Sequence, residues 1–431
     1  MEETEVIANK KTFRNYMLMW SGQLFSLMGS LIVQFVITWW VTEVTGSAVY
    51  LSIGMFLYFL PMVFVTPFAG VLTDRFNRKT IITVADSLQA LVTLWIIVMF
   101  YMNYADPFIV ILINSLRGLC QAFHQPVIAA IIPSMVPKER LSRINGINFL
   151  FTSLIQLIGP VIGATLLAFF PINLILWMDI ITFGIAITPL LLVTIPFVGN
   201  LPDIRMEEKI SFRKEFKEGM LTIKLIPGLL IILLLSMVLN FLITPLNVLM
   251  PYFVYAVHLG SAIDLATIMM GFNLGMICGA LITALKKNWK HKVIVYFSGL
   301  IIVMGTLSTL GFAPRGSFLL MAGVAIITGI ALPIVNTIYM TIVQTVVPAN
   351  KMGRVSSVDQ SLSMAIYPIG TLISGPLAEI LGVQNLFIYS AFIGVLITFL
   401  TWRFTKVRRI NYDDHLTLAT ITEKINNINV S

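Results

Sequence analysis

The segment Gly70-Val71-Leu72-Thr73-Asp74-Arg75-Phe76-Asn77-Arg78-Lys79-Thr80 decides how this sequence folds. It interrupts an apolar stretch from Val49 to about Phe100, and it places Asp74, Arg75, Arg78 and Lys79 close together. Each flanking stretch has the length of a helix that crosses a bilayer, about 20 mostly apolar residues. We therefore predict a short loop at a membrane face, whose charges fix which face it is.

The composition of the whole chain also requires a bilayer. Of its 431 residues, 58% are hydrophobic and only 11% are charged, and the mean hydropathy is +0.91, whereas soluble domains carry about 25% charged residues. The formal net charge of +8 lies in short loops, so membrane orientation explains it better than nucleic-acid binding. Cys120 and Cys278 both fall inside apolar stretches, which argues against a disulfide framework.

Twelve apolar stretches are long enough to span a membrane. We expect all of them to be α-helices, because a helix satisfies its backbone polar groups in lipid and the alternating pattern of a β-barrel is absent. The first is expected to be a retained span rather than a cleaved signal peptide. The predicted spans are 16–42, 48–72, 80–101, 107–132, 145–169, 172–195, 226–256, 263–285, 292–313, 317–346, 356–380 and 383–404.

The basic residues divide sharply between the two sides of this arrangement. Every Lys and Arg except Arg117, inside a span, and Arg315 falls on one side. Because cytoplasmic loops carry the excess of Lys and Arg, we predict a multi-pass protein of the cell (plasma or inner) membrane with both termini in the cytoplasm.

The chain is predicted to divide into two similar halves. We expect an N-terminal six-helix bundle (1–195), a cytoplasmic linker with a short amphipathic helix (196–225), a C-terminal six-helix bundle (226–405) and a cytoplasmic tail (406–431). Val136-Pro137 followed by Arg143 recurs as Val347-Pro348 followed by Arg354, an offset of 211 residues (137 to 348, 143 to 354). Two pseudo-symmetric halves are typical of transporters, in which the substrate binds near the membrane midplane.

The loop pattern G-x-L-x-D-R-x-x-R-K at Gly70–Lys79 resembles the signature loop of the major facilitator superfamily. The resemblance implies an all-α integral membrane protein with the major facilitator fold of 12 transmembrane helices. A wider set of residues is similar to the macrolide-efflux branch of the drug:proton antiporters: Gly22-Gln23, Gln34, Thr45-Gly46-Ser47-Ala48, Leu60-Pro61, Asp86, Ala122-Phe123-His124, Pro126 and Val136-Pro137.

Four polar residues inside the spans are candidates for proton coupling or substrate binding. Arg117 lies near mid-bilayer, where a charge costs about 2.5–3.5 kcal/mol or more, and Leu116-Arg117-Gly118-x-x-Gln121 resembles the superfamily's fourth-span arginine motif, which implies proton coupling. Asp179 is a candidate proton carrier or partner of a cationic substrate. His124 lies two turns beyond Arg117 on the same face, and Gln34 lies at mid-span. The alternatives are a buried structural ion pair for Arg117, a helix-packing acid hydrogen-bonded to a neighbouring span for Asp179, and structural or helix-joining hydrogen bonds for His124 and Gln34.

A second group of residues is predicted to form a cytoplasmic gate. We expect Asp74 to face the N-terminus of the eleventh span, Asp359 to pair with Arg75 or Arg78, and Asp86 to brace those arginines. The alternative is a solvated charged loop. The predicted gate residues are Gly70, Asp74, Arg75, Arg78, Lys79, Asp86 and Asp359.

Gly159, Pro160 and Gly163 resemble part of an antiporter motif on the fifth span, although Ala164 stands where a second glycine is usual. Pro removes a backbone donor and glycines permit close helix approach, so we predict a helix-packing role.

Together these features predict a secondary active transporter, acting by proton-coupled efflux of an amphipathic, macrolide-like drug through alternating access. Its partners would be a small-molecule substrate, protons and the lipid bilayer, with no cofactor and no metal, and we expect a monomer. The alternatives are a siderophore or lysolipid exporter or flippase, and an importer of a small metabolite. An enzyme is not expected, since the sequence has no phosphate loop, hydrolase motif or metal-spaced Cys/His cluster.

Overall fold

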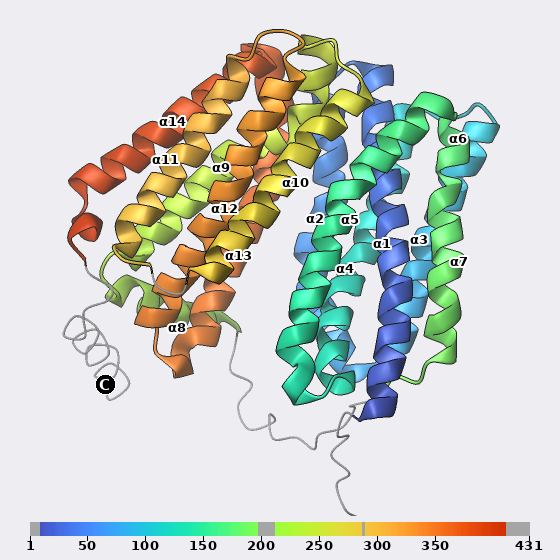
Figure 1. The fold of residues 1–431 in the computed structure, drawn as a ribbon, viewed down its shortest axis with the longest axis horizontal. Coiled ribbons are helices and arrows are strands. Elements are labelled where there is room, and N and C mark those ends of the chain that lie inside the picture. Colours follow the sequence, from blue (N-terminus) through green and yellow to red (C-terminus); the bar gives the residue numbers. More distant parts are fainter. Residues whose placement is uncertain (1–8, 197–211, 287–288, 411–431) are drawn as a thin grey trace, which may run out of the picture. The chain divides into compact units, whose positions relative to one another are not determined.

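The computed structural model describes residues 9–196, 212–286 and 289–410, and every regular element within these ranges is helical (Figure 1). The predicted tail lies largely outside them, as do residues 197–211 of the predicted linker. The elements are α1 (Lys10–Thr45), α2 (Ala48–Arg75), α3 (Arg78–Tyr101), α4 (Pro107–Met135), η1 (Lys138–Arg140), α5 (Leu141–Phe169), α6 (Ile172–Ile175), α7 (Trp177–Leu192), α8 (Phe212–Leu225), α9 (Leu229–Tyr252), η2 (Phe253–Val257), α10 (Ala262–Leu285), α11 (Lys292–Gly311), α12 (Phe318–Val346), α13 (Ala349–Leu381), α14 (Val383–Phe404) and η3 (Lys406–Arg409).

Eleven helices within the described ranges are long and apolar enough to cross a membrane, counting α6 and α7 as the single span Ile172–Leu192. The remaining predicted span is α4, a helix of 29 residues. Its sequence carries the polar residues Asn114, Arg117, Gln121 and His124, which lower its hydropathy. The all-helical membrane fold predicted from the sequence is confirmed.

Local sequence signals explain where several helices begin and end. Asn9 caps α1 by accepting hydrogen bonds from the backbone N–H groups of Lys11 and Thr12, so the first helix begins at Lys10, six residues before the predicted start. Asp106 caps α4 in the same way, with Pro107 as its first residue. Such caps satisfy backbone donors that have no partner inside the helix. Gly46 ends α1 in the left-handed conformation, with φ of 54°, which favours glycine.

By its internal contacts the chain forms two compact units. The first contains Met1–Ile204 with Val254–Ala256 and Gly260–Ala266, and the second contains the rest of the chain from Arg205. In the first unit, α1 packs against α5 and α7, and α4 packs against α2 and α3. In the second unit, α13 packs against α9 and α8, and α11 packs against α12 and α14.

The internal repeat extends from the loops to the helices themselves. Helix α4 (Pro107–Met135) and helix α12 (Phe318–Val346) have the same length and begin 211 residues apart (107 to 318). The starts of α6 and α14 are also 211 residues apart (172 to 383). Gly118 on α4 lies so close to the Tyr58 carbonyl of α2 that no Cβ would fit, and Gly329 on α12 lies equally close to the Phe272 carbonyl of α10. Equivalent glycines thus permit equivalent close helix contacts in both units.

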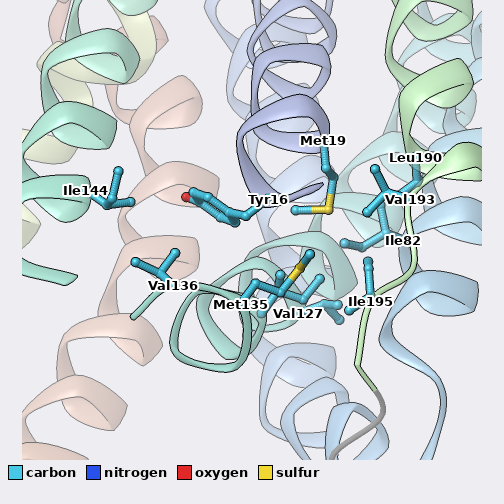
Figure 2. Close-up of a cluster of buried hydrophobic side chains, with 11 residues drawn as sticks. Tyr16, Met19, Ile82, Val127, Met135, Val136, Ile144, Leu190, Val193 and Ile195 are labelled. Carbon is cyan, nitrogen blue, oxygen red and sulfur yellow. The ribbon is translucent and has the colours of Figure 1, made fainter. Parts of the chain in front are cut away.

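A hydrophobic cluster lies at the end of the first unit near the α2–α3 and α4–α5 connections. Figure 2 shows side chains from several helices converging there. Val127 and Met135 on α4 are fully buried, as is Ile82 on α3. The buried members of the cluster are Tyr16, Met19, Ile82, Val127, Ile131, Met135, Val136, Ile144, Leu190, Val193 and Ile195.

Helix α8 lies within the stretch where the sequence predicts an amphipathic linker helix, and it docks on α13. The Glu218 carboxylate accepts a hydrogen bond from Arg354 at 2.5 Å and lies 3.9 Å from the Lys351 ammonium. Thr222 and Ile223 are buried on the same helix, and Gly219 lies against the Arg354 carbonyl, where a Cβ would not fit without displacement. Arg354, which matches Arg143 in the internal repeat, therefore connects α8 to the start of α13.

Candidate functional site

A buried ion pair lies in the first unit. Arg117 on α4 and Asp179 on α7 are 2% and 3% exposed, and the Arg117 Nη2 atom lies 3.2 Å from Asp179 Oδ2. The break at Leu176 between α6 and α7 places Asp179 in the first turn of α7, where the helix dipole favours a carboxylate. The two candidates that the sequence singled out separately are therefore partners.

Hydroxyl groups from two further helices complete the surroundings of Asp179. Thr93 on α3 donates to Asp179 Oδ2 at 2.6 Å, and Ser30 on α1 donates to Asp179 Oδ1 at 2.9 Å. Ser30 in turn accepts a hydrogen bond from Gln89 on α3 at 2.7 Å. Both oxygens of the carboxylate are engaged by three donors from three helices, which offsets the cost of burying the charge.

The Arg117 side of the pair continues into a polar chain that reaches Gln34. Arg117 Nη1 donates to Asn114 Oδ1 at 3.5 Å, and Asn114 Nδ2 donates to Gln34 Oε1 at 3.4 Å. Gln34 also bonds to the Thr38 hydroxyl at 3.4 Å. These are long hydrogen bonds, and the Arg117 Nε atom is buried without a partner among the described residues. The guanidinium is thus held firmly at Asp179 and loosely elsewhere.

A second polar cluster joins α1, α3 and α4. The Gln23 Nε2 atom donates to Asp86 Oδ2 at 3.0 Å, and the Gln23 Oε1 atom lies 2.9 Å from His124 Nε2. His124 Nε2 is also 3.8 Å from Asp86 Oδ1. His124 follows Arg117 by seven residues on α4, about two helical turns or 10 Å along the axis. The first unit therefore contains two clusters of ionisable residues, one around Arg117 and Asp179 and one around Asp86 and His124, which follow one another along α4.

Two of the predicted gate residues, Arg78 and Lys79, contact backbone carbonyls of helices in the first unit. Arg78 donates to the Ala130 carbonyl of α4 at 2.9 Å, and Lys79 donates to the Leu191 and Val193 carbonyls at the end of α7 at 2.6 and 2.9 Å. Cations at helix C-termini complement the helix dipole. Lys79 thus binds the C-terminal end of α7, whereas Arg78 binds a carbonyl inside α4, five residues before that helix ends.

Asp86 has different partners from those that the sequence suggested, since it contacts Gln23 and His124 rather than Arg78. Asp359 lies on α13, where its side chain interacts with that of Tyr339 on α12. Its pairing with Arg75 or Arg78 stays a prediction. Gly70, Asp74 and Arg75 lie in α2 at positions whose side chains are outside the described set.

The helix-packing residues lie where α5 meets α1. A Cβ at Gly159 would meet Leu31 at 3.3 Å, and one at Gly163 would meet the Phe35 ring at 3.0 Å. Pro160 is buried between them. Gly370, at the matching position of the repeat, lies against Thr244 of α9 in the same manner, at 3.0 Å.

The second unit has uncharged residues where the first has its ion pair. At the offset of 211 residues, Thr328 matches Arg117 and Ser390 matches Asp179. Both are buried, and the Thr328 hydroxyl donates to the Thr306 hydroxyl at 2.8 Å. The internal symmetry of the fold is therefore not a symmetry of charge at these positions.

Sequence reasoning missed five members of these clusters as site residues: Gln23, Ser30, Gln89, Thr93 and Asn114. The available signal was their polarity at mid-span. Hydroxyl and amide residues are frequent at helix contacts in membranes, so this signal could not separate carboxylate partners from ordinary helix packing.

Known proteins with similar sequences are membrane transporters. The family model described as Major Facilitator Superfamily matches residues 19–366. Macrolide efflux protein A of Streptococcus pyogenes is 28% identical over 394 residues, covering 91% of this chain and 96% of that relative. The multidrug efflux pump Tap of Mycolicibacterium fortuitum is 25% identical over 357 residues, covering 81% and 86%.

Among solved structures, a bacterial homologue of the iron transporter ferroportin in an inward-facing state superposes with a TM-score of 0.68 at 14% identity, covering 90% of this chain and 98% of that one. At that identity the similarity shows the fold alone. The family match and the sequence relatives indicate a transporter rather than an enzyme, and they confirm the resemblance to the macrolide-efflux branch. This chain is a multi-pass membrane protein that belongs to the Major Facilitator Superfamily.

Proposed function

We propose that the protein is a secondary active transporter that exports an amphipathic, macrolide-like small molecule across the cell membrane in exchange for protons, by alternating access. The observation that carries the proposal is the Arg117–Asp179 ion pair inside a bundle of apolar helices. Charges at this depth are costly, and in transporters they mark substrate or proton pathways. The similarity to macrolide efflux protein A supports the substrate class and the direction.

We infer the orientation and the role of the gate from the same principles. The concentration of Lys and Arg on one side supports a protein of the cell membrane with both termini in the cytoplasm, and we expect it to act as a monomer. Asp74, Arg75 and Asp359 remain the proposed gate at that face. The contacts of Arg78 with an α4 carbonyl and of Lys79 with the end of α7 support a bracing role for these two residues.

The test is transport into everted membrane vesicles, whose cytoplasmic face points outward. With an acidic lumen, we expect accumulation of a labelled macrolide above the level in vesicles from cells without the protein, and we expect an uncoupler to abolish the difference. Subtracting that baseline matters because macrolides are weak bases that an acidic lumen traps passively.

Two variants localise the activity. Asp179→Asn should remove the difference, whereas Glu43→Gln, an exposed acid on α1, should keep it. If no macrolide, siderophore, lysolipid or dye shows gradient-dependent uptake, proton-coupled efflux is excluded. Uptake of siderophore or lysolipid alone would keep the mechanism and change the substrate.

A further inference from the structure

We propose that the exchangeable proton of the cycle binds Asp86, and that Gln23 and His124 form a hydrogen-bond relay that responds to it, while the Arg117–Asp179 pair remains an ion pair. This inference rests on the proposed exchange of substrate for protons. It assigns the proton to the second cluster, joined by α1, α3 and α4, rather than to the acid that lies deepest in the first unit.

Asp179 has little capacity to accept an additional proton without rearrangement. Its Oδ1 atom accepts from Ser30, and its Oδ2 atom accepts from both Thr93 and Arg117. A proton on Oδ2, whose two acceptor sites are taken, would displace Thr93 or Arg117. A proton on either oxygen would leave the buried Arg117 without its counter-charge, which is strongly destabilising. The contacts therefore favour a permanent pair at this position.

Asp86 differs in the number and kind of its partners. Its Oδ2 atom accepts one hydrogen bond, from Gln23. Its Oδ1 atom is 3.8 Å from His124 Nε2, which is too long for a hydrogen bond. Among the described residues no other group donates to this carboxylate, so Oδ1 can take a proton without breaking a bond.

The amide of Gln23 links the two titratable groups. Because a carboxylate only accepts hydrogen bonds, an ionised Asp86 orients the amide with its NH₂ group toward Oδ2. The amide oxygen then faces His124 at 2.9 Å, so His124 must carry a proton on Nε2. This orientation is assigned from the network of hydrogen bonds.

Within this network Gln23 alone determines which nitrogen of His124 carries the proton. The tautomer of a buried histidine is ordinarily fixed by a bond at its second nitrogen. Here His124 Nδ1 is buried and has no partner among the described residues. The ring is therefore free to follow the amide.

Protonation of Asp86 reverses this arrangement. A proton that enters at Oδ1 makes the side chain a neutral acid. Because Gln23 faces the other oxygen, Oδ2, the carboxyl group must rotate to bring its O–H toward Gln23, where it donates to the amide oxygen once the amide has turned. The amide NH₂ then donates to His124 Nε2, so the ring releases its Nε2 proton to solvent and takes up a solvent proton at Nδ1, with no net change on the ring. One proton is gained in total, and the hydrogen bonds between α1, α3 and α4 change with it.

The other ionisable groups that act electrostatically on Asp86 come from two helices. Asp179 on α7 is one, and the Cys120 thiol, on the same helix as His124, is the other. Asp179 is already paired with Arg117. His124 is therefore the nearest titratable partner, which makes Asp86 and His124 the pair to test.

The first experiment separates coupling from transport in proteoliposomes. Wild type should accumulate a macrolide against its gradient when the lumen is acidic, and it should also exchange labelled for unlabelled macrolide without a pH gradient. Asp86→Asn should lose accumulation and keep exchange, with Glu43→Gln behaving as wild type. Gln23→Ala should shift the pH profile of accumulation, a result that a purely structural role would not give.

If wild type shows no gradient-driven accumulation, the proposed function fails. If wild type is driven but Asp86→Asn accumulates equally, only the present assignment is overturned.

A second measurement follows His124 directly in the wild-type protein and does not depend on the transport activity of any variant. In wild-type protein with ¹⁵N-labelled histidine, the signals assigned with His124→Gln should change from the Nε2–H to the Nδ1–H form as the pH falls. Retention of the Nε2–H form throughout the range, or its direct conversion to the doubly protonated ring, would overturn the relay independently of the result with Asp86→Asn.

Discussion

Arg117 and Asp179 illustrate how a buried charge pair constrains mutation. Because both side chains are almost fully buried and face each other at 3.2 Å, removing one leaves the other uncompensated, at a cost of about 3–5 kcal/mol. We predict that Asp179→Asn and Arg117→Met each lower the thermal unfolding temperature in detergent, and that the double variant Arg117→Met/Asp179→Leu recovers much of the loss without recovering transport. Single variants as stable as wild type would contradict the pair.

His258 provides a pH-dependent prediction outside the membrane spans. The residue follows η2, its side chain is 4% exposed and its ring lies 4.5 Å from that of Phe253. Burial and the nearby charge of Arg315 lower the pKa of His258, against a smaller opposing effect of the Pro314 carbonyl.

Because the unfolded chain has the ordinary histidine pKa of about 6.5, it binds this proton more readily than the folded protein does, and stability falls as the pH drops through that value. We predict that wild type loses more thermal stability than His258→Gln between neutral and mildly acidic pH. Equal losses in the two proteins would contradict the assignment. The comparison uses the difference between proteins, so other titrating groups cancel.

At the scale of single helices, the glycine contacts make the clearest prediction. Gly118→Ala should destabilise the first unit, since the new methyl group would meet the Tyr58 carbonyl of α2 and backbone cannot move aside as a flexible side chain would. Gly184→Ala on α7 is the matched control, because nothing lies within 4 Å of a Cβ there. It should be neutral or slightly stabilising. Thermal unfolding of the two variants checks both expectations, and equal stability would show that α2 and α4 are not in close contact.

The helices were more predictable than the contacts between them. Their number, their type and the offset of 211 residues follow from hydropathy and from repeated pairs such as Val136-Pro137 and Val347-Pro348, since lipid leaves helices as the only solution for such spans. The break at Leu176 that places Asp179 in the first turn of α7 has no comparable signal in the sequence.

The sequence predicts which charged residues belong to the candidate site, but it does not predict which of them contact one another. A mid-span Arg117 and Asp179 stand out in a chain of this composition, but distance along the sequence does not say that they meet. Asp86 shows the limit most clearly, because proximity in sequence suggested Arg78, whereas helix packing brings Asp86 to Gln23 and His124. A contact with Arg75, whose side chain is outside the described set, stays a prediction. Tertiary packing decides which polar groups satisfy one another.

At the scale of the whole molecule, orientation is the property that the charge distribution predicts. Single cysteines in place of Asn77, Tyr50 and Ser317, in a protein whose Cys120 and Cys278 have been replaced, can be labelled with a membrane-impermeant reagent. We predict that positions 50 and 317 react from outside intact cells and that position 77 reacts only in everted vesicles. The opposite pattern would invert the topology and, with it, the proposed direction of transport.

The most direct test of the central claim, that proton movement drives drug export, uses purified wild-type protein reconstituted into liposomes with an acidic lumen. In liposomes without protein a macrolide distributes as a weak base does, and a protein that only opened a pathway would speed the approach to that level without changing it. We predict that molecules inserted with their cytoplasmic face outward raise the final macrolide content above that level. A final content equal to that of protein-free liposomes, reached faster, would contradict the account.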